Sequence, residues 1–276
     1  MQGYGYYNGD FAPLSEISVP LSDRALYFGD GIYDAAIGRG EKICFENEHI
    51  ERFLRNAKRL KIRHSLTLES LSELLHEVIH RANTPEFFLY FQLSRSGDRR
   101  IHSFGEENGS NLLITVTPFS ERDIKHRLCV ITHEDLRYYY CDVKTLNLLP
   151  SVLASGEALR AGCDETIFVR DGIVTECAHS NVFILKDKIL YTHPTDNLIL
   201  PGITRRHFIE AGKRHGIRTV EIPFPLAKLL SADEVIITST TKLARLVDTL
   251  DGARIGGRDS DTGELLCSAL RDEVWK

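Results

Sequence analysis

Four polar motifs occur in a fixed order in the second half of the chain, and this order constrains the fold more than any single motif does. Lys144 comes first, within residues 141–149, and Glu176 follows it. Residues 202–204 and residues 239–240 complete the series. The chain therefore supplies, in this order, an amine, a carboxylate, a glycine-opened helix start and a hydroxyl-rich strand end.

Pyridoxal phosphate is a cofactor that needs these four groups. Its aldehyde forms a Schiff base with an amine, its ring nitrogen takes a carboxylate, and its phosphate takes two sets of donors. Each motif alone is common, but the ordered set is not. The sequence therefore predicts an enzyme that binds pyridoxal 5'-phosphate.

At these residues the chain resembles the fold type IV pyridoxal-phosphate enzymes. These include D-amino-acid aminotransferases, branched-chain aminotransferases, (R)-amine transaminases and aminodeoxychorismate lyase. The similarity extends from residues 28–33 to the cluster that begins at Thr238, and residues 141–149, 202–205 and 238–241 are most similar to the D-amino-acid aminotransferases. The resemblance implies an α/β (α+β) fold with a small N-terminal α/β domain and a larger C-terminal domain with a β-barrel-like core. It also implies a homodimer whose active site lies between the domains and borrows a loop from the partner subunit.

Length and charge exclude several classes of protein. With 276 residues, of which 42% are hydrophobic, the chain can bury one large core or two modest ones. A net charge of −5 disfavours nucleic acid and anionic membranes as partners. The first twenty residues contain no Lys or Arg, and no apolar run approaches the ~18–20 residues of a membrane span, so neither a signal peptide nor a transmembrane helix is expected.

Six cysteines are spread along the chain without a C-x-x-C pair. This spacing is typical of reduced thiols rather than of a disulfide framework or a metal site. The sequence therefore predicts a cytoplasmic protein with reduced cysteines.

The pattern of apolar residues and turn signals predicts two domains. We expect a first domain at 1–117, a connector at 118–121 and a second, cofactor-binding domain at 122–276. In the first domain, strands are expected at 3–7, 32–38, 42–45, 87–94 and 111–117, and helices at 47–61 and 68–82. In the second, strands are expected near 128–133, 217–222 and 233–238, with short strands joined by turns at Asp171, Asp187 and Asp251, and helices at 149–161, 204–215 and the C-terminus.

The resemblance assigns a role to each cofactor-binding candidate. Lys144 would carry the Schiff base and act as the catalytic proton carrier, and Glu176 would keep the ring nitrogen protonated. The remaining candidates share the phosphate as their target: Arg52, Ile203, Thr204, Ser239 and Thr240.

Three further residues are candidates for binding the substrate. In the D-amino-acid aminotransferases, an Arg-x-His pair from the neighbouring subunit and a tyrosine hold the substrate α-carboxylate, and these match Arg100, His102 and Tyr33. Alternate residues of an extended loop point the same way, so both cations can meet one carboxylate. The alternative is a solvated basic loop, since Arg95 and Arg99 lie close by.

Two departures from that subgroup stand out. Cys177, Ala178 and His179 replace the Gly and Ser residues that often follow the acid, and they leave substrate specificity open. Asp34 replaces the glutamate that commonly follows the tyrosine, and the sequence offers no explanation for it.

A competing motif occurs at residues 76–80, which fit the H-E-x-x-H pattern of zinc peptidases. On a helical projection, His76 and His80 share a polar stripe opposite the apolar face, and Pro85 breaks the helix soon afterwards. We therefore interpret the motif as a solvated face and expect no metal.

These observations predict transamination of D-amino acids with a small 2-oxo acid acceptor, pyruvate or 2-oxoglutarate. The alternatives are a branched-chain L-amino-acid aminotransferase or an (R)-amine transaminase, then aminodeoxychorismate lyase, and from a different class the zinc peptidase.

Overall fold

A computed structural model describes residues 3–97, 99–105, 108–121 and 125–276. The chain divides into two compact units. Unit 1 comprises Met1–Ser120 and Val143–Asn147, and unit 2 comprises Glu121–Asp142 and Leu148–Lys276. The predicted domain limits, 1–117 and 122–276, remain a prediction.

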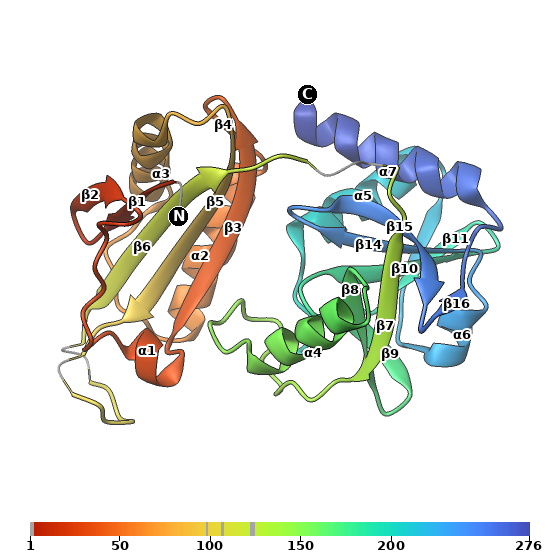
Figure 1. The fold of residues 1–276 in the computed structure, drawn as a ribbon, viewed down its shortest axis with the longest axis horizontal. Helices are drawn as coiled ribbons and strands as arrows, with labels where there is room; N and C mark the ends of the chain where they lie inside the picture. The colour runs from red at the N-terminus through yellow and green to blue at the C-terminus, as the bar shows by residue number, and fades with distance from the viewer. Residues whose placement is uncertain (1–2, 98, 106–107, 122–124) are drawn as a thin grey trace. The chain divides into compact units, whose positions relative to one another are not determined.

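Unit 1 is an antiparallel sheet with two long helices packed on one face (Figure 1). Its strands follow the order β2 (Asp10–Pro13), β1 (Tyr4–Tyr7), β6 (Ser110–Pro118), β5 (Glu86–Arg95), β3 (Gly31–Arg39) and β4 (Lys42–Ile43). Its helices are α1 (Arg24–Phe28), α2 (Glu46–Arg59) and α3 (Leu68–Ala82).

The core of unit 1 lies between the sheet and these helices. On β5, alternate residues from Phe87 to Leu93 are buried, as expected of a strand with one face against a core. They share one cluster with Phe53 of α2 and with Leu71 and Leu75 of α3. Burying each large apolar side chain contributes roughly 1.5–3 kcal/mol, so this face fixes the helices on the sheet.

Helix α3 occupies the predicted range because its ends are marked in the sequence. Thr67 Oγ1 accepts a hydrogen bond from the Ser70 amide at 3.1 Å, and Ser70 Oγ accepts one from the Thr67 amide at 2.9 Å. Asn83 ends the helix in the left-handed region at φ 47°. On the polar side, His76 Nε2 lies 3.1 Å from a carboxylate oxygen of Glu46 in α2, whereas His80 is exposed.

Residues 143–147 pair with the start of β3 as a short added strand. The Tyr33 amide donates to the Lys144 carbonyl at 3.0 Å, and the Leu146 amide donates to the Gly31 carbonyl at 3.1 Å. A Cβ at Gly31 would lie 2.7 Å from a methyl carbon of Leu146 and 2.7 Å from the Leu93 carbonyl. Only glycine lets the segment approach so closely.

Unit 2 is built on one mixed sheet. The strands follow the order β12 (Arg218–Glu221), β11 (Ile189–Thr192), β10 (Asn181–Lys186), β14 (Glu234–Ser239), β15 (Leu243–Leu250), β7 (Leu128–Glu134), β8 (Glu165–Arg170), β9 (Ile173–Cys177) and β13 (Phe224–Pro225), and β16 (Ala253–Arg254) pairs with β15. The helices are α4 (Leu149–Arg160), α5 (Ile203–Arg214), α6 (Leu226–Leu230) and α7 (Ser260–Trp275).

This sheet curls around a common interior (Figure 1). Its two end strands, β12 and β13, are separated in sequence by Ile222 and Pro223 alone. Three Cα–Cα steps span roughly 11 Å at full extension, so the two edges of the sheet must lie close together. The interior holds a cluster of buried residues that includes Val130, Ile237 and Val247, and the predicted barrel-like core of an α/β fold is confirmed.

Two predictions were incomplete. The short helices α1 and α6 and the strand β2 were not predicted, because five or fewer residues give no usable periodicity. The prediction of reduced thiols is wrong for Cys129 and Cys163, whose sulfurs are bonded. The Asp164 amide donates to the Cys129 carbonyl at 2.8 Å, so the register of β7 and β8 places the Cα atoms of Cys129 and Cys163 4.7 Å apart.

Among the described residues, no helix is both long and apolar enough to cross a membrane.

Candidate active site

Lys144 lies against the ring of Tyr33 in unit 1. The ammonium nitrogen is 4.2 Å from the ring centroid, within the range of a cation–π contact. Tyr33 in turn stacks on Tyr90, with 5.4 Å between ring centroids. The backbone pairing of residues 143–147 with β3 fixes the Cα of Lys144, so only the flexible side chain can move its amine.

Asp34, the residue after Tyr33, is buried and holds two basic side chains. Arg52 Nε and Nη2 each donate to an Asp34 carboxylate oxygen at 2.8 Å, and His49 Nδ1 lies 2.7 Å from Oδ1. Burial alone would raise the pKa of Asp34, but Arg52 and His49 hold it well below its usual range. The unexplained aspartate of the sequence is therefore the group that fixes the direction of Arg52.

Arg100 and His102 both lie beside Phe28, the last residue of α1. The Arg100 guanidinium carbon is 5.3 Å from the Phe28 ring centroid, and the His102 ring is 5.1 Å from it. Both side chains are exposed. Within the described residues, the ring contacts of Tyr33 are instead with Lys144 and Tyr90. One chain thus brings Arg100 and His102 together with each other but not with Tyr33.

Glu176, near the end of β9, is a buried carboxylate that accepts hydrogen bonds from three residues. It accepts hydrogen bonds from Arg137 Nη1 at 2.5 Å, from Asn181 Nδ2 at 2.9 Å and from the Leu200 amide at 3.1 Å. Burial raises the pKa of the Glu176 carboxyl to about 7, and the Arg137 guanidinium limits that rise.

Arg137 is itself held by a second acid. Its Nε and Nη2 donate to the two carboxylate oxygens of Asp135 at 2.9 Å. Asp135 also accepts from Thr175 Oγ1 at 2.9 Å and pairs with Arg170 at 3.1 Å. Burial would raise the pKa of Asp135, yet the two arginines lower it to about 2. Arg137 is therefore shared between Asp135, which is fully ionised at neutral pH, and Glu176.

The start of α5 and the end of β14 have the features of a phosphate site. Gly202 caps α5 without a side-chain hydrogen bond, and the first turn contains no acid, so the positive end of the helix dipole is not neutralised. A Cβ at Gly202 would lie 2.1 Å from Asn181 Oδ1, so only glycine fits beside Asn181. Thr238, opposite Asn181 in the sheet, has a buried hydroxyl that lacks a hydrogen-bond partner within the described part of the chain.

The residues that could hold a phosphate there all carry backbone or hydroxyl donors. Ile203 and Thr204 form the first turn of α5 and are buried. Ser239 and Thr240 follow Thr238, and Ser239 Oγ accepts a hydrogen bond from the Lys242 amide at 3.2 Å. This donor set fits a phosphate dianion, as a glycine-opened helix start does in general.

A buried carboxylate connects this loop to the turn after Glu176. Glu165 accepts hydrogen bonds from Lys242 Nζ at 3.0 Å and Ser180 Oγ at 2.8 Å, and it pairs with His179 Nδ1. Burial opposes ionisation, but His179 and Lys242 lower the pKa of Glu165 to about 2. Cys177 and Ala178 are buried. Of the three residues that replace the Gly and Ser of the D-amino-acid aminotransferases, His179 is therefore the one whose side chain is exposed.

Sequence reasoning missed Arg137, Asn181 and the Glu165–Lys242 pair. Arg137 alternates with Asp135 just after β7, a charged pair that follows the end of a strand, and this was the available signal. The pairing of Glu165 with Lys242 depends on strand register and left no mark in the sequence.

Replacing Arg137 with Met should raise the pKa of Glu176 further above about 7, because the nearest positive charge is lost while burial remains. Titration of the Glu176 carboxyl carbon by NMR would measure this shift. Arg170→Met is the matched control, because Arg170 pairs with Asp135 rather than with Glu176. An unchanged Glu176 titration in Arg137→Met would contradict the assigned role of this ion pair.

Known proteins with similar sequences belong to one family of aminotransferases. Residues 31–249 match the family model of amino-transferase class IV. The D-alanine aminotransferase of Staphylococcus epidermidis is 36% identical over 263 residues, which cover 94% of this chain and 93% of that protein. The D-alanine aminotransferase of Listeria monocytogenes is 35% identical over 94% of this chain and 92% of its own length.

Solved structures share the fold at lower identity. The branched-chain aminotransferase of the archaeon Thermoproteus uzoniensis, solved with norvaline, superposes with a TM-score of 0.87 at 24% identity, covering 99% of this chain and 95% of that one. The branched-chain enzyme of Escherichia coli gives 0.88 at 23% identity over 96% and 92% of the two chains. The chain belongs to the class IV aminotransferases, enzymes that depend on pyridoxal phosphate.

Proposed function

We propose that this aminotransferase exchanges the amino group between D-amino acids and a 2-oxo acid, pyruvate or 2-oxoglutarate. The observation that carries the proposal is the alignment of the D-alanine aminotransferases with 94% of the chain. The position of Arg100 and His102 beside Phe28 supports it, because a guanidinium and an imidazole side by side suit an α-carboxylate.

Lys144 is proposed as the attachment point of the cofactor and as the proton carrier. When bound, the cofactor supplies an aldehyde that takes up the amino group and a ring that withdraws electrons from the substrate. After the substrate amine replaces that of Lys144, the freed Nζ would accept the proton from the substrate Cα and donate it to the carbon that carried the cofactor aldehyde. The contact of Nζ with the Tyr33 ring keeps the amine near one position.

Glu176 is proposed to hold the protonated ring nitrogen of the same cofactor molecule. The support is its pKa, which burial raises to about 7 because one shared guanidinium compensates its charge only in part. A positively charged N–H at this carboxylate would supply the missing compensation. Arg137 and Asn181 orient the carboxylate for that contact.

The phosphate is proposed to bind the first turn of α5 and the loop after β14. Ile203 and Thr204 would donate from the helix start, and Ser239 and Thr240 from the strand end. Arg52, whose guanidinium is held by Asp34, is proposed as a further ligand of the phosphate.

Other activities have weaker support. A branched-chain or (R)-amine specificity would not need the Arg100–His102 pair, and aminodeoxychorismate lyase does not resemble this chain there. Against the zinc peptidase, His76 Nε2 is directed at Glu46, and no group of three potential metal ligands occurs among the described residues.

A homodimer is proposed because α4 presents an uncovered apolar face. Among its residues, Leu149, Val152, Leu153 and Leu159 are 57–78% exposed, whereas Ala154 and Ala158 are buried on the other side. An apolar helix face of this kind is typical of a protein interface. Arg100 and His102 would then complete the site of the partner subunit. A cytoplasmic location remains a prediction of the sequence.

Lys144→Ala should abolish both transamination and the visible absorption band of the lysine-bound cofactor, because the amine that attaches the cofactor is absent. Absorption spectroscopy of the purified protein measures the band. Lys213→Ala is a suitable control, since Lys213 is exposed on α5. A colourless wild-type protein with stoichiometric zinc would instead favour the peptidase.

Arg100→Ala should lower kcat/KM for D-alanine roughly 10–150-fold, because a charge-assisted hydrogen bond of about 1.5–3 kcal/mol is lost. Steady-state kinetics with pyruvate or 2-oxoglutarate would measure the loss. Arg99→Ala, at the preceding position of the same loop, should have little effect. A wild-type preference for L-leucine over D-amino acids would overturn the proposed specificity.

Light scattering should give a mass of twice 31.3 kDa, and Leu153→Glu should shift the protein towards monomer with loss of activity, because a charge would be buried in the interface. Leu230→Glu is the matched control, as Leu230 is an equally exposed leucine on α6. A fully active wild-type monomer would contradict the homodimer.

A further inference from the structure

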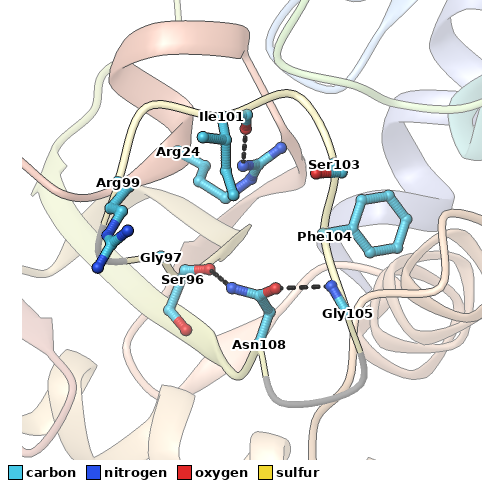
Figure 2. Close-up of a pocket in the computed structure, with 9 residues that line it drawn as sticks. All are labelled: Arg24, Ser96, Gly97, Arg99, Ile101, Ser103, Phe104, Gly105 and Asn108. Atoms are coloured by element: carbon cyan, nitrogen blue, oxygen red, sulfur yellow. Dashed lines mark hydrogen bonds between the residues drawn. The ribbon is translucent and has the colours of Figure 1, made fainter.

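Arg24, in α1, is a buried arginine whose guanidinium binds the backbone of the loop that carries Arg100 and His102. Its Nη1 donates to the Ile101 carbonyl at 2.6 Å, and its Nη2 donates to the His102 carbonyl at 3.1 Å. Figure 2 shows Arg24 beneath the loop with its bond to Ile101. The third nitrogen, Nε, donates to Asp30 at 2.7 Å.

A second arginine, Arg95, binds the same acid, Asp30, and contacts the same loop at Phe104. Arg95 Nε donates to Asp30 at 3.1 Å, and its other two nitrogens donate to the Leu60 and Lys61 carbonyls at 2.8 Å each. The guanidinium carbon lies 3.5 Å from the ring centroid of Phe104. Asp30 therefore fixes two arginines, one beneath residues 101–102 and one beneath Phe104.

The chemistry of this arrangement requires arginine. Three nitrogens of one planar guanidinium bind one carboxylate and two carbonyls, which a lysine ammonium cannot reproduce in the same geometry. The side chain of Arg24 is only 4% exposed. Water therefore cannot replace a hydrogen bond that its guanidinium loses.

The two bound carbonyls belong to Ile101, which lies between Arg100 and His102, and to His102 itself. Arg24 also lies over Phe28, 4.7 Å from the ring centroid, on which Arg100 and His102 rest. One guanidinium thus contacts both the backbone of the pair and the ring that supports its side chains.

We propose that Arg24 is a positioning residue for recognition of the substrate carboxylate. It sets the distance and direction of Arg100 and His102 without touching the substrate, and it thereby determines the preference for substrates that carry an α-carboxylate. This inference rests on the proposed role of Arg100 and His102.

The test compares Arg24→Lys and Arg24→Met with wild-type holoenzyme. Both variants should raise KM for D-alanine roughly tenfold or more, with kcat at saturation changed far less, because the loop loses its fixed geometry but the reacting groups remain. Binding of pyridoxal phosphate and its visible band should be unchanged. Hydrogen exchange of the Ile101 and His102 amides should become faster than in wild type.

Arg81→Met is the matched control. Arg81 also pairs with a carboxylate through Nε, at 2.7 Å, and lies 4.3 Å from a phenylalanine ring, but these partners are Glu77 and Phe11 rather than residues of the loop. Its replacement should leave KM for D-alanine and the exchange of the loop unchanged.

Arg100→Ala, measured in parallel, separates the two proposals. If Arg100→Ala impairs D-alanine binding and neither Arg24 variant does, the positioning role is wrong and the carboxylate role stands. If Arg100→Ala has no effect, both are wrong. If Arg24→Met fails to fold, Arg24→Lys decides, and unchanged exchange at Ile101 and His102 in that variant would overturn the inference.

Discussion

The ion pair between Glu176 and Arg137 is the interaction on which the proposed cofactor chemistry of unit 2 depends. Each of three other buried carboxylates has two basic partners: Asp34, Asp135 and Glu165. Their pKa values lie below the usual range, despite burial that would raise them. Glu176 has one guanidinium, shared with Asp135, and its pKa is raised. Glu176 therefore differs from the other three carboxylates because its negative charge is only partly compensated. A cationic N–H group could supply the rest of the compensation.

In unit 1 the alternation of side chains along β3 separates two tasks. Successive residues of a strand point to opposite faces. Tyr33 therefore contacts Lys144, while Asp34 is directed at Arg52 and His49 of α2. The backbone bond between Tyr33 and Lys144 fixes the lysine in register with that alternation. A single strand thus positions both the lysine proposed for the Schiff base and the arginine proposed for the phosphate.

The sequence predicts this fold well where local signals are strong. Helix α3 has a capping box, an apolar stripe and a terminating Asn83, so its limits could be predicted. The α1 helix has five residues and no stripe, yet it carries Arg24 and Phe28. The contacts of Arg137, Glu165 and Lys242 depend on which strands are neighbours and in what register, and these are long-range facts that no local pattern contains. Family resemblance supplied the cofactor-binding candidates, but not the residues that hold them.

The proposed cofactor and substrate groups differ in how their backbones are held. The proposed cofactor-binding residues of unit 2 lie at strand ends and at a helix start, where the ladder of the sheet already fixes the main chain. Residues 99–104 belong to no strand, and the carbonyls of Ile101 and His102 accept from a side-chain donor, Arg24. Loops placed on a rigid scaffold are where specificity changes at low cost to stability. In this chain Arg24 and Arg95 hold the loop, and Asp30 couples them. Loss of the bonds from Arg24 to the loop carbonyls would therefore act first on the proposed substrate-binding residues, whereas Arg95 also holds the carbonyls of Leu60 and Lys61.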